Sequence, residues 1–266
     1  MKKLINIILI MLLSFLLVAC TNDTNKNGDN TGKETAKETS ENKIKLEEID
    51  QSEYKYIENG GFFVNNQGIV IDKKNTEGYK IVEWYFDPLC PSCMQLEQAT
   101  SPYLLEIMGD KTLINYKPMT FLGRPKDEDP NNPIISYSDV MSSIILSIAE
   151  NDPELVNKYI IKVINPDFVD SISKLNDTEK QNEAMKKIYT EELSGKKWDQ
   201  IKSKMDEKMT TSRNLTNYIK NDQELKSKTL DGKLSVPLIY VRGEEKILNI
   251  YEENMDFRPL LEEKLK

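Results

Sequence analysis

Two cysteines lie three positions apart near the middle of the chain, in the tetrapeptide Cys90-Pro91-Ser92-Cys93. A thiol pair at this spacing can close a disulfide and open it again by exchange with the thiols of another protein. The chain has three cysteines in all, and the third, Cys20, directly follows an apolar N-terminal run. No cysteine is therefore left for a structural cross-link elsewhere. The spacing predicts a redox-active pair.

Three other roles for this pair are weaker. A structural disulfide between Cys90 and Cys93 would close a very short loop, to which chain entropy would contribute roughly 2 kcal/mol at best. A zinc site needs about three or four ligands, and two thiolates without histidine would need carboxylates to complete the set. Two incidental cysteines would be unusual in a chain that otherwise avoids the residue. We therefore expect neither a metal nor a cofactor at this site.

The absence of histidine narrows the chemistry further. The 266 residues include 36 basic and 44 acidic side chains but no histidine, and the formal net charge is -8. Serine or cysteine nucleophiles paired with histidine, and imidazole general bases, are therefore excluded. Proton transfer falls to carboxylates, lysine, tyrosine or thiols. The acidic balance argues against a nucleic-acid-binding protein and is explained most simply by solubility.

The residues around the cysteine pair predict a strand, a turn and a helix. Residues 79–86 are rich in β-branched and aromatic side chains, which is typical of a buried strand. Residues 87–89, Asp-Pro-Leu, predict a turn. A helix then begins at Cys90, with Pro91 in its first turn, and Pro102 predicts a kink or break in it. The free N–H groups and the dipole of a helix N-terminus favour a thiolate at Cys90.

This strand, Cys-Pro-x-Cys and helix, together with a later Val236-Pro237, resemble the thioredoxin-fold thiol-disulfide oxidoreductases, and among them the DsbA family. The resemblance implies that Cys90 is the solvent-facing sulfur attacked by substrate and that Cys93 is the resolving thiol. It also implies a cis peptide bond between Val236 and Pro237, beside the cysteine pair. Backbone groups around such a proline can bind an extended substrate segment by strand addition.

The same resemblance gives a role to Glu83. Family members carry an acid in this strand, near the resolving cysteine, and Glu83 is the residue that would act here as a buried proton carrier. Strand alternation puts Ile81 and Glu83 on one side of the sheet. The turn from Glu83 to Cys90 is one residue longer than in many relatives. The alternative for Glu83 is a carboxylate at the strand end that reaches solvent.

Ser92 departs from the best-known DsbA proteins, which carry a histidine between their two cysteines. A serine hydroxyl can donate one hydrogen bond to a thiolate at Cys90, but it brings no positive charge. We therefore expect a less depressed pKa of Cys90 and a pair that is less oxidising than the extreme of about -120 mV.

The distance between the two motifs indicates an insertion. More residues lie between Cys93 and Pro237 than a bare thioredoxin domain can hold, and DsbA-type proteins resemble this chain in inserting a helical domain there. We expect an α/β fold, with a thioredoxin-like core over 54–122 and 231–266 and an inserted α-helical domain over 123–230.

Hydrophobic periodicity and turn residues predict the remaining elements. These are a hairpin over 54–72, a strand over 111–120, a polar loop over 124–133, helices over 137–149, 153–164, 177–193, 198–209 and 212–221, a strand over 246–250, and a C-terminal helix over 255–266.

Residues 1–19 are predicted to be a lipoprotein signal peptide. Two lysines precede an apolar run over 4–19, which is shorter than the about 20 residues of a membrane-spanning helix. The run ends in Leu-Val-Ala-Cys at Cys20, and this tetrapeptide resembles the lipobox of bacterial lipoproteins. The resemblance implies that Cys20 carries a thioether-linked diacylglycerol and becomes the N-terminus. The alternative is an ordinary signal peptide followed by an incidental cysteine.

Residues 20–53 are predicted to be the lipidated N-terminus and a flexible tether. Residues 21–43 contain no large apolar side chain, so their burial cannot offset the entropy cost of folding. As a flexible coil this segment would span roughly 25–30 Å. The lipid and tether would hold a folded domain at the outer face of the cytoplasmic membrane, where disulfides persist. The composition, rich in asparagine, lysine and isoleucine, indicates a Gram-positive source.

These features together predict an extracytoplasmic, membrane-anchored thiol-disulfide oxidoreductase that oxidises cysteine pairs of exported proteins. A membrane-associated electron acceptor, which the sequence does not identify, would reoxidise the Cys90-Cys93 pair. Two alternatives stay open. One is an extracytoplasmic disulfide reductase of the same fold, and the other is a binding lipoprotein without enzymatic activity.

Overall fold

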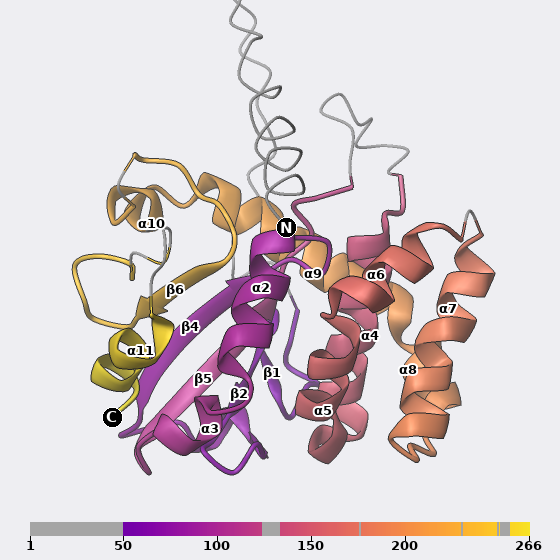
Figure 1. Ribbon diagram of the computed structural model, residues 1–266, viewed down its shortest axis with the longest axis horizontal. Helices are drawn as coiled ribbons and strands as arrows, with labels where there is room; N and C mark the ends of the chain where they lie inside the picture. The colour runs from indigo at the N-terminus through magenta and orange to yellow at the C-terminus, as the bar shows by residue number, and fades with distance from the viewer. Residues whose placement is uncertain (1–49, 124–133, 176, 230, 249, 251–255) are drawn as a thin grey trace, which may run out of the picture. The chain divides into compact units, whose positions relative to one another are not determined.

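The structure, a computed structural model, describes residues 50–123, 134–175, 177–229, 231–248, 250 and 256–266. The predicted signal peptide, Cys20, most of the predicted tether and the predicted loop over 124–133 lie outside the described residues. Within the described ranges, every helix is too short or too polar to cross a membrane. Figure 1 shows a mixed sheet on one side and a group of helices beside it.

The sheet is built around one parallel pair of strands. Its strands are β1 (Ile57–Glu58), β2 (Gly61–Val64), β3 (Val70–Ile71), β4 (Lys80–Phe86), β5 (Thr112–Pro118) and β6 (Leu238–Val241). In the described residues they are ordered β1-β2-β5-β4-β6, with β3 also paired to β2. β4 and β5 are parallel, whereas β2 pairs antiparallel with β5, and β6 with β4. A parallel pair needs a crossover connection, which the helices between β4 and β5 supply.

The predicted N-terminal hairpin is confirmed as two successive antiparallel pairs, β1 with β2 and β2 with β3. Asn59 and Gly60 form the first turn with positive φ angles of 51° and 68°. A Cβ atom at Gly60 would lie 2.5 Å from the side chain of Leu215. Glycine is therefore required at this turn by its backbone conformation and by the close approach of a later helix.

Ten α-helices are described, together with the short helical turns η2 (Lys73–Asn75) and η3 (Ile188–Glu192). They are α2 (Pro91–Thr100), α3 (Leu104–Ile107), α4 (Tyr137–Asn151), α5 (Pro153–Val163), α6 (Pro166–Ser173), α7 (Thr178–Lys187), α8 (Trp198–Ser203), α9 (Met205–Asn221), α10 (Gln223–Ser227) and α11 (Phe257–Leu265). Ser136 caps α4 in a capping box with Asp139, and Asp177 caps α7. The predicted break at Pro102 separates α2 from α3.

Several boundaries differ from the sequence prediction. α6 and α10 were not predicted because each is short, although Asn165 caps α6 and Asp222 caps α10. The helix predicted over 198–209 is divided between α8, which ends at Ser203, and α9, which begins at Met205. The helix predicted over 212–221 is the remainder of α9. The predicted helix over 177–193 ends in the π-helical turn η3.

The predicted strand over 246–250 is wrong for its described residues, 246–248 and 250. Leu248 donates one backbone hydrogen bond to the carbonyl of Ile239 at 2.9 Å. The chain therefore returns beside β6, but this single bond does not make a ladder.

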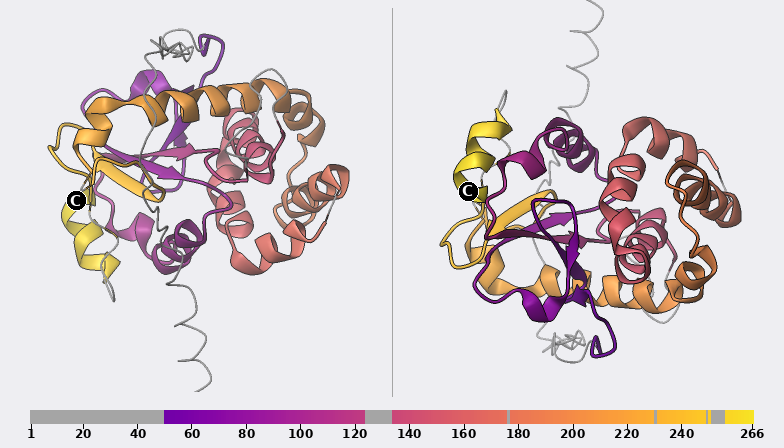
Figure 2. Two further views of the ribbon diagram at one scale, coloured as in Figure 1. Left: turned by 90° about the horizontal axis from the view of Figure 1, so that it is seen from above. Right: turned by 90° about the horizontal axis from the view of Figure 1, so that it is seen from below.

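Helices cover both faces of the sheet (Figure 2). α2 packs on the face that carries Val82, Trp84 and Phe86. On the opposite face, Tyr85 belongs to a separate apolar cluster with Leu215 of α9. This layered arrangement buries the apolar side chains of both sheet faces.

The helical region shares its apolar core with the sheet. Residues 138–149 of α4 are all buried, as expected for a helix surrounded on every side. α4 contacts β1, β2 and β5 as well as α5, α8 and α9. α9 runs from the helical group across the sheet (Figure 2). The domain boundaries that the sequence predicts, at 122/123 and 230/231, stay predictions.

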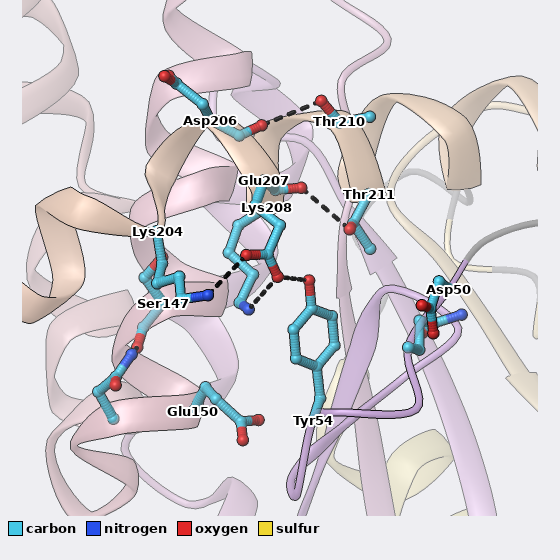
Figure 3. A network of polar contacts seen from close by, with 12 residues as sticks. Asp50, Tyr54, Ser147, Glu150, Lys204, Asp206, Glu207, Lys208, Thr210 and Thr211 are labelled. Atoms are coloured by element: carbon cyan, nitrogen blue, oxygen red, sulfur yellow. Dashed lines mark hydrogen bonds and ion pairs between the residues drawn. The ribbon is translucent and has the colours of Figure 1, made fainter.

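A polar network fixes the first described residues to the helices (Figure 3). The Tyr54 hydroxyl donates to the carboxylate of Glu207. The ammonium group of Lys208 lies 3.3 Å from the centroid of the Tyr54 ring and 3.4 Å from Glu207 Oε1. Burial lowers the pKa of Lys208. Glu150 of α4 accepts from the backbone N–H groups of residues 55–56. The segment that follows the predicted tether is thus held against α4 and α9.

Candidate active site

The two cysteines lie at the N-terminus of α2, where the sequence predicts them. Cys90 is the N-cap residue, and its Sγ accepts a hydrogen bond from the backbone N–H of Cys93 at 3.3 Å. The sulfur thus takes the place that a side-chain oxygen has at many helix N-termini. Pro91 follows in the first turn, where no intrahelical bond is lost. The N–H groups of the first helical turn, which have no acceptor within the helix, and the helix dipole favour negative charge on the Cys90 sulfur.

The two thiols differ in how readily they ionise. The Cys93 thiol donates to the Cys90 sulfur and, despite burial, lowers the pKa of Cys90 below its ordinary value. Burial, together with the hydrogen bond to Cys90, raises the pKa of Cys93 far above its ordinary value. Cys90 and Cys93 are both buried, with exposed fractions of 5% and 3%, so the solvent-facing position expected for Cys90 is not observed. In the reduced pair, Cys90 is therefore the sulfur that ionises and Cys93 the one that keeps its proton.

The loop before β6 lies against Cys90. The peptide bond between Val236 and Pro237 is cis, as predicted. In its thiol form Cys90 donates to the carbonyl oxygen of Val236, with Sγ and oxygen 3.2 Å apart. The fold thus brings together two segments that are 146 positions apart in the sequence.

The structure does not bring Glu83 to the cysteine pair. Along β4, Glu83 alternates with Trp84, and Trp84 lies on the face covered by α2 and both cysteines. The Glu83 carboxylate instead lies 2.5 Å from Nε of Arg242 and 3.4 Å from Nζ of Lys117. It therefore joins β4 to β5 and to the end of β6. Strand alternation accounts for this position, because Val82, Trp84 and Phe86 take the helix-facing side of β4.

Asp87, which the sequence indicated only as part of a turn, is a fully buried acid close to the pair. Its carboxylate accepts from the backbone N–H of Leu89 at 2.8 Å and of Leu122 at 2.9 Å, and from the Ser138 hydroxyl at 2.6 Å. Burial raises the pKa of Asp87, and these hydrogen bonds oppose the rise. The local sequence does not predict that Asp87 is buried and hydrogen-bonded here, because Asp before Pro is also common in exposed turns.

Glu97 is a second buried acid that the sequence analysis did not single out. It lies one helical turn after Cys93 in α2, on the buried side of the helix. Burial raises the pKa of Glu97 to about 7. The spacing of four residues from Cys93 is the signal that could have found it, since such positions share one helix face.

Comparison with known proteins establishes the fold. No family model and no curated protein matches the sequence. The MdbA protein, a thiol-disulfide oxidoreductase from Corynebacterium diphtheriae, has a similar structure, with a TM-score of 0.54, 15% identity and coverage of 79% of this chain and 92% of that one. The MdbA protein from Corynebacterium matruchotii gives a TM-score of 0.50 and 17% identity, covering 74% and 86% of the two chains.

The chain has the fold of these MdbA proteins. This confirms the predicted fold class, an α/β thioredoxin-like core with an inserted α-helical region, and with it the DsbA-like architecture that the motifs indicated. Within this fold, the Cys90-Cys93 pair at a helix N-terminus and the cis-proline loop face each other. Such an arrangement is chemically able to exchange a disulfide with an external thiol.

Proposed function

We propose that the protein is an extracytoplasmic thiol-disulfide oxidoreductase that oxidises cysteine pairs of exported proteins. The observation that carries the proposal is the position of Cys90 Sγ, at the N-terminus of α2 and 3.2 Å from the Val236 carbonyl. The asymmetry of the two thiols supports it, because exchange needs one reactive and one resolving sulfur. The MdbA proteins that share this fold are themselves described as thiol-disulfide oxidoreductases.

The reaction begins with the Cys90-Cys93 disulfide. A substrate thiolate attacks the sulfur of Cys90, the bond between the two cysteines breaks, and Cys93 leaves and takes up a proton. A second thiolate of the substrate then attacks the substrate sulfur of the mixed disulfide and releases Cys90 as a thiolate. The substrate loses two electrons to the pair. The lowered pKa of Cys90 favours its departure as a thiolate in the second step.

Val236 and Pro237 are the residues proposed to bind substrate. The Val236 carbonyl already contacts the sulfur that would carry the mixed disulfide. An extended substrate segment that reaches Cys90 would therefore pass along this loop and pair with its backbone, as in strand addition. Recognition through backbone groups would suit many different exported chains.

The lipid anchor at Cys20 forms part of this proposal. A diacylglycerol on Cys20 and the polar segment after it would place the folded domain beside the outer face of the cytoplasmic membrane. A membrane-associated electron acceptor could then reach the reduced pair. If this is right, wild-type protein will fractionate with membranes, and a Cys20→Ser variant will not.

The activity is tested by oxidative refolding of a reduced, unfolded protein with known disulfides. Wild-type protein, oxidised beforehand, is expected to accelerate disulfide formation, and Cys90→Ser is expected to abolish the effect. Cys93→Ser should accumulate a mixed disulfide through Cys90, visible as a mass increase that reductant removes. Equal rates for wild-type and Cys90→Ser protein would refute the proposal.

A disulfide reductase of the same fold is the second candidate. The buried negative charge of Asp87 favours it, because this charge destabilises a thiolate on Cys90 and Ser92 brings no positive charge to oppose it. Trapping the thiols of growing cells with a mass-tagging alkylator separates the two directions. A pair found mostly as a disulfide supports the oxidase, and a pair found mostly as a dithiol supports the reductase.

A further inference from the structure

Asp87 joins the redox turn to the helical insertion. Its two carboxylate oxygens accept from three segments: the turn itself at Leu89, the chain after β5 at Leu122, and the first turn of α4 at Ser138. Asp87 and Ser138 both have an exposed fraction of 0%. A carboxylate buried with three directed hydrogen bonds has a fixed position, so the turn that carries Cys90 is fixed to α4 as well.

The backbone of the same residue holds the cysteines. The Asp87 carbonyl accepts from the N–H of Cys90 at 2.9 Å, and the Asp87 backbone also forms a hydrogen bond that stabilises charge on the Cys93 sulfur. The side chain acts in the opposite direction, since its negative charge raises the pKa of Cys90 and of Cys93. One residue thus positions both sulfurs while its charge makes a thiolate on either sulfur less stable.

The described hydrogen-bond partners of the Asp87 carboxylate fix its position but do not neutralise its negative charge. These partners are the Ser138 hydroxyl and the backbone N–H groups of residues 89, 121 and 122, and all are neutral. Asp139, which follows Ser138 in α4, pairs with Arg213 of α9 at 2.7 Å. A buried charge held by neutral dipoles acts on nearby groups through a low dielectric.

We propose that Asp87 is a positioning residue that locks the redox turn to the helical insertion and, through its buried negative charge, opposes a thiolate on Cys90. This rests on the redox role proposed above for the pair. A less stable thiolate makes the reduced pair less favourable relative to the disulfide. Asp87 therefore holds the pair at a less oxidising potential than the helix N-terminus alone would give.

The test compares Asp87→Asn with Ser138→Ala. The first variant removes the charge, and the second removes one hydrogen bond of the same junction but keeps the charge. Thiolate absorbance of the reduced proteins gives the pKa of Cys90, and equilibration with glutathione gives the ratio of dithiol to disulfide. We expect Asp87→Asn to lower the pKa of Cys90 and, at a pH above that pKa, to shift the glutathione equilibrium toward the dithiol by about tenfold per pKa unit.

The control separates charge from structure. Ser138→Ala is expected to unfold at a lower urea concentration than wild type. Its pKa of Cys90 and its ratio of dithiol to disulfide in glutathione are expected to equal those of wild type. Equal shifts in both variants would mean that loosening the junction, and not the charge, sets the potential, and would overturn the proposal. Unchanged titration and equilibrium in Asp87→Asn would overturn it too.

A second measurement needs no change at Asp87. Coupling between two charges is reciprocal, so a thiolate at Cys90 must raise the pKa of Asp87 by as much as Asp87 raises that of Cys90. Carboxyl carbon chemical shifts of reduced wild-type and Cys90→Ser protein report this difference. Equal Asp87 titration in the two proteins would contradict the proposal. The glutathione equilibrium depends only on the cysteine pair. It therefore tests the effect of Asp87 on this pair even if the protein does not oxidise folding proteins.

Discussion

At the scale of single residues, the site rests on an unequal pair of thiols. Cys90 lies where a helix N-terminus and a neighbouring thiol both stabilise its charge, whereas burial and the hydrogen bond to Cys90 disfavour a charge on Cys93. The largest contribution to the lowered pKa of Cys90 is the hydrogen bond from the Cys93 thiol. The reactive sulfur therefore depends on its resolving partner before any substrate arrives.

This dependence predicts a difference between two substitutions of Cys93. Cys93→Ala removes the donor and is expected to raise the pKa of Cys90, whereas Cys93→Ser keeps an O–H group that can donate. The pH profile for alkylation of Cys90 by iodoacetamide should therefore lie at higher pH in Cys93→Ala than in Cys93→Ser. Identical pH profiles for the two variants would show that the helix N-terminus alone sets the reactivity of Cys90.

Glu97 predicts a pH dependence of stability. Its pKa is about 7 in the folded protein and has an ordinary value of 4.5, so the folded state binds the proton more tightly. The resulting cost to stability is absent below pH 4.5, grows as the pH rises toward 7 and is constant above it. Glu97→Gln should therefore gain up to about 3 kcal/mol over wild type at pH 8 and little at pH 4.5.

Urea unfolding of the reduced proteins at several pH values measures this gain. The difference between wild type and Glu97→Gln isolates the one carboxyl group, because every other titrating residue is shared. A difference that stays constant between pH 4.5 and 8 would show that Glu97 does not titrate in this window.

At the scale of elements, the crossover from β4 through α2 to β5 positions the cysteines. The face of β4 opposite α2 carries ion pairs that stabilise the fold. Glu83 lies between Lys117 of β5 and Arg242 at the end of β6. The side chains of Glu83 and Lys117 are only 7% and 5% exposed. Breaking one member of a buried ion pair leaves the other charge without compensation.

Glu83→Gln is therefore expected to destabilise the protein by about 3 kcal/mol, since Lys117 stays buried without its carboxylate. The rate of thiol exchange at Cys90 should not change, because Glu83 lies across the sheet from α2. Glu58→Gln is the matched control: Glu58 is more exposed and lies 3.8 Å from Arg242, so its loss should cost under about 1 kcal/mol. Slower exchange in Glu83→Gln at equal pH would restore Glu83 as a proton carrier.

At the scale of the described molecule, one apolar core runs from the α2 face of the sheet through α4 into the helical region. The first described residues join that core through the network around Tyr54 and Lys208 (Figure 3). A pull on the predicted tether would therefore act on α9 and α4, not on the hairpin alone.

Tyr54 predicts the strength of that attachment. Tyr54→Phe loses the hydrogen bond to Glu207 but keeps the ring beneath Lys208, and should cost about 1 kcal/mol. Tyr54→Ala also removes the ring and should cost about 3 kcal/mol or more. Limited proteolysis should then cut within residues 50–56 in Tyr54→Ala well before it does in Tyr54→Phe. Equal resistance in both variants would show that the ring does not hold this segment.

The sequence alone determined the features that depend on near neighbours. The spacing of Cys90 and Cys93, the strand before them and the helix after them are set by side-chain pattern and by Pro91 at the first helical turn. The cis peptide bond between Val236 and Pro237 was implied by the resemblance to the DsbA family. The long separation of these motifs indicated the helical insertion.

The tertiary structure alone decided which side chains share the space around the sulfurs. The face of β4 that Glu83 occupies depends on where α2 packs, and the burial of Asp87 depends on the approach of Ser138, which is 51 positions away. Likewise α9, which belongs in sequence to the predicted insertion over 123–230, covers the sheet through Leu215. Burial and charge coupling arise only when distant segments pack together. The local pattern therefore predicts the reactive cysteine pair but not the buried acids near it.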